Sequence, residues 1–107
     1  MSSPDEIWLA NIPFTDGRAP KIRPVLVLWL DAADCVVSAV TSAPPRSPSD
    51  VSHVDWQAAG LRVPSAARLS RLDCLEQTLL LKKLGKLSIA DAIQLKRVWA
   101  QQIQLHF

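Results

Sequence analysis

The residues best suited to chemistry in this 107-residue sequence are arginines and hydroxyl-bearing side chains. Arg23 stands directly before Pro24 and the apolar run "VLVLWL" at residues 25–30. Six apolar residues in a row, rich in β-formers, predict a strand that is buried on both faces. A charged side chain beside such a strand must emerge at its end, where it either covers the edge of the core or faces a ligand.

Other kinds of catalytic or metal site find no support in the sequence. It contains no P-loop, no HExxH motif, no Cys/His cluster and no pair of carboxylates at catalytic spacing. His53 and His106 are isolated, and we expect both on the surface or partly buried. Cys35 and Cys74 match no metal or redox spacing, and we expect both to be small hydrophobic residues of the core. The remaining Arg, Lys, Ser, Thr and Asp suit the binding and polarisation of a phosphodiester, without metal or cofactor.

The formal net charge is +2, but the basic residues are unevenly distributed. Residues 1–61 contain four basic and seven acidic side chains, whereas residues 62–107 contain eight basic and three acidic ones. Even in the acidic half, residues 17–24, "GRAPKIRP", carry three basic residues and no acid. A polyanion could use this pattern, and a solvated basic rim would have the same composition, so charge alone leaves both readings open.

Length and composition indicate one domain over residues 1–107, with a modest core that needs neither metal nor disulfide. The hydrophobic fraction of 49% with mixed charge argues against disorder. No apolar run approaches the roughly 20 residues that span a bilayer. The first residues, "MSSPDEIW", lack the apolar stretch of a signal peptide. We therefore expect a cytoplasmic protein with no membrane association.

Hydrophobic patterning and turn residues predict a mainly β chain with one helix at its C-terminal end. A four-residue hairpin loop is expected at 31–34 and a proline-rich loop at 43–50, while 78–87 suits either strand or helix. Pro24 can sit only at the start of a strand or on a sheet edge. Short strands with one closing helix are typical of a small antiparallel barrel or half-barrel. The predicted strands cover residues 5–12, 24–30, 35–42, 51–56 and 63–75.

The clearest single element is the predicted helix over residues 88–107. Ser88, followed three residues later by Asp91, resembles a capping arrangement. Lys96 interrupts the apolar face, so part of that face is expected to meet solvent or a partner. The residues predicted to form this face are Ile89, Ala92, Ile93, Trp99, Ala100, Ile103 and Phe107.

Seven short motifs occur in an informative order: "DEIWL", "PFTDG", "KIRPVLVL", "VTS", "DWQAAGL", "PSAARL" and "KKLGKLS", followed by a helix. In order and spacing they resemble the MazF/PemK toxins of bacterial toxin–antitoxin pairs, in the branch with a short first loop. The resemblance runs from about Asp5 to the last helix. It implies an SH3-like barrel, a homodimer, and a metal-independent endoribonuclease that cleaves single-stranded mRNA. It also implies a cognate antitoxin that blocks the RNA groove.

The resemblance places Arg23 and Thr41 in the catalytic centre. A further motif, Arg-x-Asp, assigns Arg68 to it, but the Asp position is Ser70 here. Arginine is a poor base, so Arg23 and Arg68 are expected to stabilise transition-state charge. The alternatives are an ion pair of Arg68 with Asp73 or Glu76, an Arg23 that only covers the core's edge, and a Thr41 that is simply a β-former.

The same resemblance implies a set of RNA contacts around this centre. Arg18 stands where some of these toxins carry a histidine. With Ser70 in place of the expected acid, either a proton moves through water or Asp16, or catalysis is weak. The residues expected to contact RNA are Asp16, Arg18, Lys21, Ser42 and Ser70.

A second reading is a non-catalytic or degenerate module on the same barrel that acts by binding protein, as the related gyrase-poisoning CcdB toxins do. Such toxins typically end in an aromatic helix, and Trp99 and Phe107 keep this reading open. The ribonuclease reading requires an RNA-facing groove that contains Arg18, Arg23, Thr41 and Arg68. The binding reading requires an exposed helix end.

Overall fold

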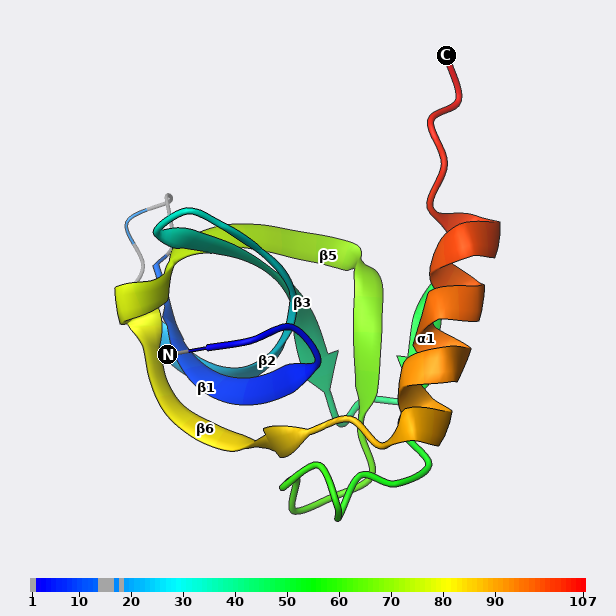
Figure 1. Ribbon diagram of the computed structural model, residues 1–107, viewed down its shortest axis with the longest axis horizontal. Helices are drawn as coiled ribbons and strands as arrows, with labels where there is room; N and C mark the ends of the chain where they lie inside the picture. The colour runs from blue at the N-terminus through cyan, green and yellow to red at the C-terminus, as the bar shows by residue number, and fades with distance from the viewer. Residues whose placement is uncertain (1, 14–16, 18) are drawn as a thin grey trace.

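Six antiparallel strands form one curled sheet in the computed structural model, which describes residues 2–13, 17 and 19–107. The strand order is β4-β5-β3-β2-β1-β6, and helix α1 (Ile89–Gln102) lies alongside β4 and β5 (Figure 1). A short 3₁₀ turn, Gln77–Leu79, precedes the last strand. The architecture confirms the mainly β, SH3-like fold with a C-terminal helix. The strands are β1 Glu6–Ile12, β2 Lys21–Asp31, β3 Asp34–Thr41, β4 Asp50–Ser52, β5 Ala66–Glu76 and β6 Leu80–Lys86.

Strand β2 carries the apolar run and extends three residues before Pro24, farther than predicted. Its pairing with β1 begins at Lys21, but its pairing with β3 begins only at Val25. Pro24 therefore lies on a local sheet edge, as its missing N–H requires. Val25, Leu26 and Val27 are almost fully buried, as predicted. Trp29 and Leu30 are 43% and 37% exposed, so the predicted burial on both faces is wrong for the second half of the run. The first residues of β2 consequently project beyond β3 while β1 holds them.

The hairpin between β2 and β3 is tighter than predicted. Asp31 pairs with Asp34, so only Ala32 and Ala33 form the turn in place of the expected four-residue loop. Ala32 adopts a φ of 52°, the left-handed conformation that two-residue hairpin turns need. Alanine gives no sequence signal for this conformation, because glycine and asparagine are the residues that usually supply it.

The core consists of two clusters, one on each face of the curled sheet. The first joins Ile7 and Leu26 to the helix through Leu95, and the second contains Val25, Val27 and other strand residues. Cys35 is fully buried in the second cluster, as predicted, and burial raises the pKa of its thiol. Cys74 is exposed, so its predicted core position is wrong. It lies on β5 opposite Val36, close to the hairpin end of the sheet.

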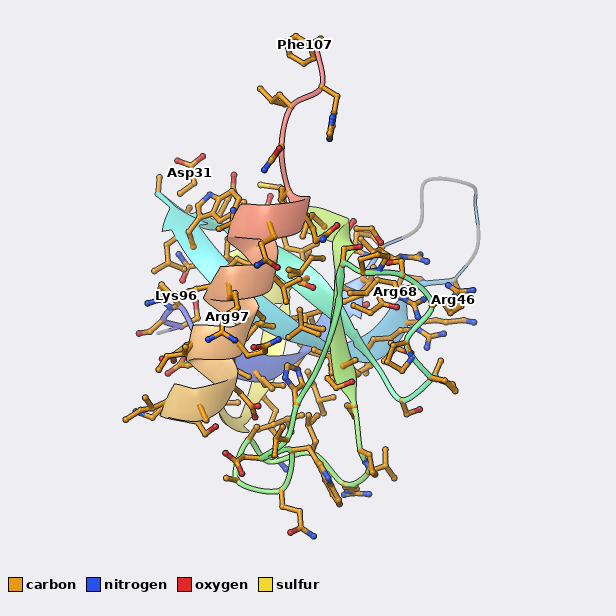
Figure 2. All side chains as sticks on the ribbon, turned by 90° about the vertical axis from the view of Figure 1, so that its right-hand side faces the viewer. Asp31, Arg46, Arg68, Lys96, Arg97 and Phe107 are labelled. Carbon is orange, nitrogen blue, oxygen red and sulfur yellow. The ribbon has the colours of Figure 1, made fainter. Side chains whose placement is uncertain are left out.

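The helix is shorter than predicted, and its buried face is different. It ends at Gln102, and the tail carries Phe107, which is fully exposed, away from the body of the protein (Figure 2). Ile89 and Ile93 are also mostly exposed, whereas Leu95 and Val98 contact the core together with Ala92, Trp99 and Ile103. The predicted face was therefore rotated too far around the helix. The only helices in the described part of the chain are too short to cross a membrane.

The N-terminus of α1 is tied to the segment that follows β4. Ser88 Oγ accepts a hydrogen bond from Asp91 N–H at 3.1 Å, which confirms the predicted cap. The carboxylate of Asp91 is 2% exposed and accepts hydrogen bonds from the backbone N–H groups of Val54 and Asp55, each at 2.9 Å. A carboxylate at this helical position is also favoured by the helix dipole. One buried side chain thus joins the helix to a loop 36 residues earlier.

That loop approaches β6 through two glycines. A Cβ on Gly60 would lie 2.0 Å from the carbonyl oxygen of Leu84, and one on Gly85 would lie 2.5 Å from that of Ala59. Gly60 also has a φ of +84°. Both glycines belong to the sequence motifs that carried the family resemblance. Their backbone contact lays this segment against edge strand β6 and so covers that edge of the sheet.

Replacing Asp91 with Ala should destabilise the protein by about 2–4 kcal/mol, because two partly buried backbone N–H groups lose a charged acceptor and hydrogen bonds to charged groups contribute roughly 1.5–3 kcal/mol each. Asp91→Asn, which keeps one carbonyl oxygen, should fall between Ala and wild type. Urea unfolding measures these differences. Ser88→Ala, which removes only the cap, should cost about 1 kcal/mol. If the Asp91→Ala protein were no less stable than the Ser88→Ala protein, the two hydrogen bonds from Val54 and Asp55 would not stabilise the fold as proposed.

His53 is buried rather than on the surface or partly buried, with 4% exposure and no hydrogen-bond partner for either ring nitrogen among the described residues. Burial disfavours the charged imidazolium and lowers the pKa of His53, an effect that the nearby Asp91 carboxylate partly offsets. The folded state therefore favours the neutral form of the His53 imidazole.

The free energy of unfolding should fall as the pH is lowered below the ordinary histidine pKa of 6.5. The unfolded chain takes up a proton there, and the folded chain does so only at lower pH. The contribution is therefore complete above 6.5 and is lost as pH falls through the lowered pKa. His53→Leu should have a flatter pH profile in urea unfolding. Parallel profiles for the two proteins would show that His53 does not cause the slope.

Candidate active site

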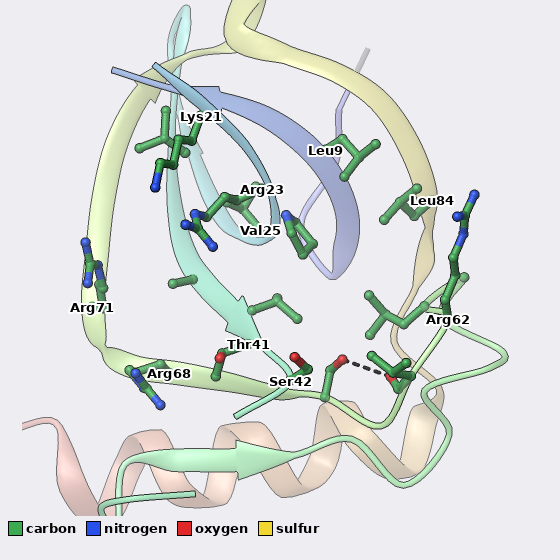
Figure 3. A pocket seen from close by; sticks show the side chains of 18 of the residues that line it. Leu9, Lys21, Arg23, Val25, Thr41, Ser42, Arg62, Arg68, Arg71 and Leu84 are labelled. Atoms are coloured by element: carbon green, nitrogen blue, oxygen red, sulfur yellow. Dashed lines mark hydrogen bonds between the residues drawn. The ribbon is translucent and has the colours of Figure 1, made fainter. Parts of the chain in front are cut away.

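A cavity of about 850 Å³ opens on the concave side of the curled sheet. Strands β2, β3 and β5 form one wall, and β6 with the segment after Gly60 contributes the other (Figure 3). Among the described residues that line it, one acidic side chain, Asp73, faces six basic ones. Positive charge therefore dominates the cavity, as the binding of a polyanion requires. The basic residues are Lys21, Arg23, Arg62, Arg68, Arg71 and Lys82.

Arg23 reaches the cavity from the part of β2 that projects beyond β3. It lies opposite Ala10 of β1 in the sheet, and its guanidinium points into the cavity with Lys21 nearby (Figure 3). Strand pairing on the β1 side fixes the backbone of both residues. The sequence argument that a rigid strand positions Arg23 is consistent with this geometry.

Two hydroxyl groups lie at the end of β3. Thr41 is paired with Ala66 of β5, and Thr41 Oγ1 accepts a hydrogen bond from the N–H of Ala43 at 3.1 Å. Since this oxygen accepts, its own hydrogen can be donated to an anion in the cavity. Ser42 is exposed and also lines the cavity (Figure 3). The structure thus brings Arg23, Lys21, Thr41 and Ser42 together in the lining of one cavity, and their roles there stay predictions.

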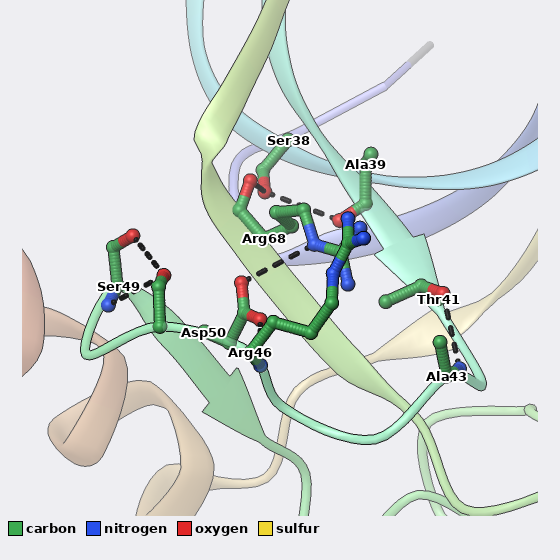
Figure 4. A network of polar contacts seen from close by, with 9 residues as sticks. Ser38, Ala39, Thr41, Ala43, Arg46, Ser49, Asp50 and Arg68 are labelled. Atoms are coloured by element: carbon green, nitrogen blue, oxygen red, sulfur yellow. Dashed lines mark hydrogen bonds and ion pairs between the residues drawn. The ribbon is translucent and has the colours of Figure 1, made fainter.

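Arg68 enters the same cavity from β5, but its partner is not the one considered from the sequence. Its Nε donates to Asp50 Oδ1 at 3.3 Å (Figure 4). The alternative ion pairs with Asp73 or Glu76 are therefore wrong in detail. In the β4–β5 pair Asp50 lies directly opposite Arg68, which places the two side chains together. The charge pairing that sequence reasoning sought close along the chain comes from the neighbouring strand.

Ser70 is not brought to the cavity with the others. Between β3 and β5 the register shifts, so that Ala39 pairs with Arg68 but Ser38 pairs with Leu72. This bulge leaves Ser70 exposed and outside the cavity lining, while Arg68 and Arg71 both line it. Its contact with RNA stays a prediction. Asp16 and Arg18 lie outside the described residues.

Sequence reasoning missed Asp50 and Arg62. Arg62 follows Gly60 and reaches the cavity only because the two glycines seat that segment on β6. In the sequence Asp50 is the last residue of the predicted proline-rich loop, and no neighbouring residue indicates that it pairs with Arg68. In the part of the chain that the structure describes, no three His, Cys, Asp or Glu side chains come together as metal ligands.

The sequence matches a family profile over residues 3–103, and that family is described as PemK-like, MazF-like toxin of type II toxin-antitoxin system. The chain belongs to this family. The matched residues include the curled sheet, the C-terminal helix and the residues that line the basic cavity. No curated protein sequence matches the chain.

Solved structures share the fold at low sequence identity. The Mycobacterium tuberculosis toxin MazF-mt6 is 21% identical, with a TM-score of 0.74, over 95% of this chain and 99% of that one. An endoribonuclease in complex with its cognate antitoxin, from a mycobacterial species, is 15% identical with a TM-score of 0.75, over 100% and 99%. MazF from Deinococcus radiodurans is 17% identical with a TM-score of 0.69, over 98% and 97%.

Proposed function

We propose that this toxin is an endoribonuclease that cleaves single-stranded mRNA without a metal ion. The observation that carries the proposal is the convergence of six basic side chains and the Thr41 hydroxyl in one cavity of a MazF-family chain. A phosphodiester backbone is the ligand that matches such a cavity in charge and in hydrogen bonding. Neighbours of the same fold that are named endoribonuclease support it.

The proposed reaction uses the 2′-hydroxyl of the substrate as the nucleophile. Its oxygen forms a bond to phosphorus, and the bond from phosphorus to the 5′-oxygen breaks, so that the products carry a cyclic phosphate and a 5′-hydroxyl. Water accepts the proton from the 2′-hydroxyl and returns one to the 5′-oxygen. Arg23 and Arg68 stabilise the added negative charge on the phosphoryl oxygens, and Thr41 donates a hydrogen bond to them.

The proposed partners follow from the same basic cavity. An antitoxin with an acidic segment would occupy the cavity and compete with RNA, and such binding weakens as salt rises. We also propose a homodimer acting in the cytoplasm as one domain over residues 1–107. Exposed apolar side chains on α1, among them Ile89 and Ile93, leave surface for a second copy.

Cleavage of single-stranded RNA by the purified protein should survive an excess of EDTA, because the described residues form no metal-ligand group. A substrate with one 2′-deoxy residue at the scissile position should resist cleavage, because it lacks the nucleophile. Gel analysis of end-labelled oligonucleotides measures both, and the products should carry a 5′-hydroxyl. Activity that EDTA abolishes and Mg²⁺ restores would overturn this mechanism.

Arg23→Ala should lower the cleavage rate about 10²–10³-fold, the usual cost of losing one well-placed charge-stabilising donor. Arg23→Lys should recover little of the rate, since an ammonium cannot copy the guanidinium fork. The melting temperature should change little in either variant. Arg97→Ala on the outer face of α1 is the matched control, because it removes the same charge far from the cavity (Figure 2). Full activity of Arg23→Lys would favour a merely structural Arg23.

The second candidate, a non-catalytic module that binds protein, is favoured by the exposed Phe107 at the chain's end. Trp99 does not present a free aromatic face in the same way. Its ring packs edge-on against Trp29, with centroids 5.9 Å apart and planes at 86°. A protein that binds a partner through Phe107, and that fails to cleave any single-stranded RNA, would replace the ribonuclease proposal with this one.

A further inference from the structure

The carboxylate of Asp50 is fixed at both of its oxygens. Oδ1 accepts from Arg68 Nε at 3.3 Å, and Oδ2 accepts from the backbone N–H of Arg46 at 2.8 Å (Figure 4). The Asp50 side chain is 1% exposed, and that of Arg68 is 14% exposed. Because the two residues face one another across paired strands, the sheet fixes the backbone from which each side chain extends. Asp50 is therefore a rigid anchor for the Arg68 guanidinium.

The anchor uses only one edge of that guanidinium. Arg68 Nη2 is buried and has no hydrogen-bond partner among the described residues. A buried charged donor without an acceptor is unfavourable by more than a neutral hydrogen bond would be. Arg68 also lines the cavity, so an anion bound there could provide the missing acceptor once the side chains that cover Nη2 shift slightly. The unsatisfied atom points to a ligand rather than to a finished structural ion pair.

We propose that Asp50 is a positioning residue for Arg68: it holds the guanidinium by Nε so that Nη2 meets a non-bridging phosphate oxygen of the RNA. This inference rests on the proposed ribonuclease function. Asp50 itself does not touch the substrate.

The competing explanation is that the ion pair only fastens β4 to β5. Strand β4 has three residues, and a cross-strand ion pair would strengthen such a short pairing. A fastening role predicts lower stability with unchanged chemistry per folded molecule. A positioning role predicts that Asp50 affects cleavage only through Arg68. A double-mutant cycle separates these two cases.

The cycle compares wild type, Asp50→Asn, Arg68→Ala and the double variant, with Asp31→Asn as a control. Asp31 is exposed at the hairpin end of β2, far from Arg68 (Figure 2), so it makes the same change of charge at a distance. Single-turnover cleavage of a single-stranded RNA gives the rate. Affinity for a 2′-deoxy oligonucleotide that cannot be cleaved gives binding. Both are measured well below each variant's melting temperature.

We expect Arg68→Ala to slow cleavage about 10²–10³-fold, as for other charge-stabilising donors. Asp50→Asn should slow it about 10- to 100-fold, because a guanidinium displaced by about 1 Å loses much of its effect. The double variant should be no slower than Arg68→Ala alone, and Asp31→Asn should match wild type. Arg68→Lys keeps the charge beside Asp50 but lacks Nη2, so it should be as slow as Arg68→Ala while it stays as stable as wild type.

Three results would overturn the inference while the proposed function stands. They are a wild-type rate for Asp50→Asn, effects of the two substitutions that multiply in the double variant, and full activity of Arg68→Lys. The last of these does not depend on whether Asp50→Asn folds. A wild-type protein that binds the uncleavable oligonucleotide but cuts no RNA would instead overturn the proposed function. The double-mutant cycle would then be evaluated from the affinities for the uncleavable oligonucleotide instead of from rates. Effects of Asp50→Asn and Arg68→Ala that multiply in the affinity of the double variant would again contradict a positioning role for Asp50.

Discussion

The buried carboxylate of Asp91 organises more of the molecule than its position on the helix suggests. It accepts hydrogen bonds from the N–H groups of Val54 and Asp55, and so fixes the position at which the segment after β4 begins. That segment then reaches β6, where Gly60 and Gly85 allow backbone to lie against backbone. Beyond Gly60 the chain forms one wall of the cavity. The shape of the candidate site thus depends on a helix cap on the other side of the sheet.

The site's chemistry depends on how the curled sheet gathers like charges. Each basic side chain of the cavity extends from a paired strand or from the segment that Gly60 and Gly85 hold against β6. The backbone is therefore fixed, and the repulsion between like charges does not move these residues apart. Two carboxylates moderate the repulsion: Asp73 within the lining and Asp50 behind Arg68. Arg68 is held by a charge partner, and its Nη2 donor has no acceptor among the residues that the structure describes. Positional rigidity here comes from strands rather than from loops.

Much of this arrangement was predictable because it is local. The burial of residues 25–27, the cap formed by Ser88 and the placement of Arg23 beside a rigid strand all follow from neighbouring residues. The motifs that resemble the MazF/PemK toxins also contain Gly60 and Gly85, whose contact no periodicity indicates. The pairing of Asp50 with Arg68 could not be predicted, since it depends on a register between β4 and β5. The helix face was predicted only in part: Ala92, Trp99 and Ile103 pack against the core. Tertiary contacts, not helical periodicity alone, decided that Leu95 rather than Ile93 is buried.

The pairing of β1 with β6 has a consequence for the order of events during synthesis. Residues 6–10 pair with residues 80–86, so one side of the first strand stays unpaired until the last strand, β6, has been made. Contacts so distant in sequence form slowly, because a long loop must close before they contribute. A ribosome-bound chain that has not yet exposed β6 therefore lacks the β6 wall and Lys82. A protein of a toxin family built in this way becomes a complete molecule only at the end of its own translation.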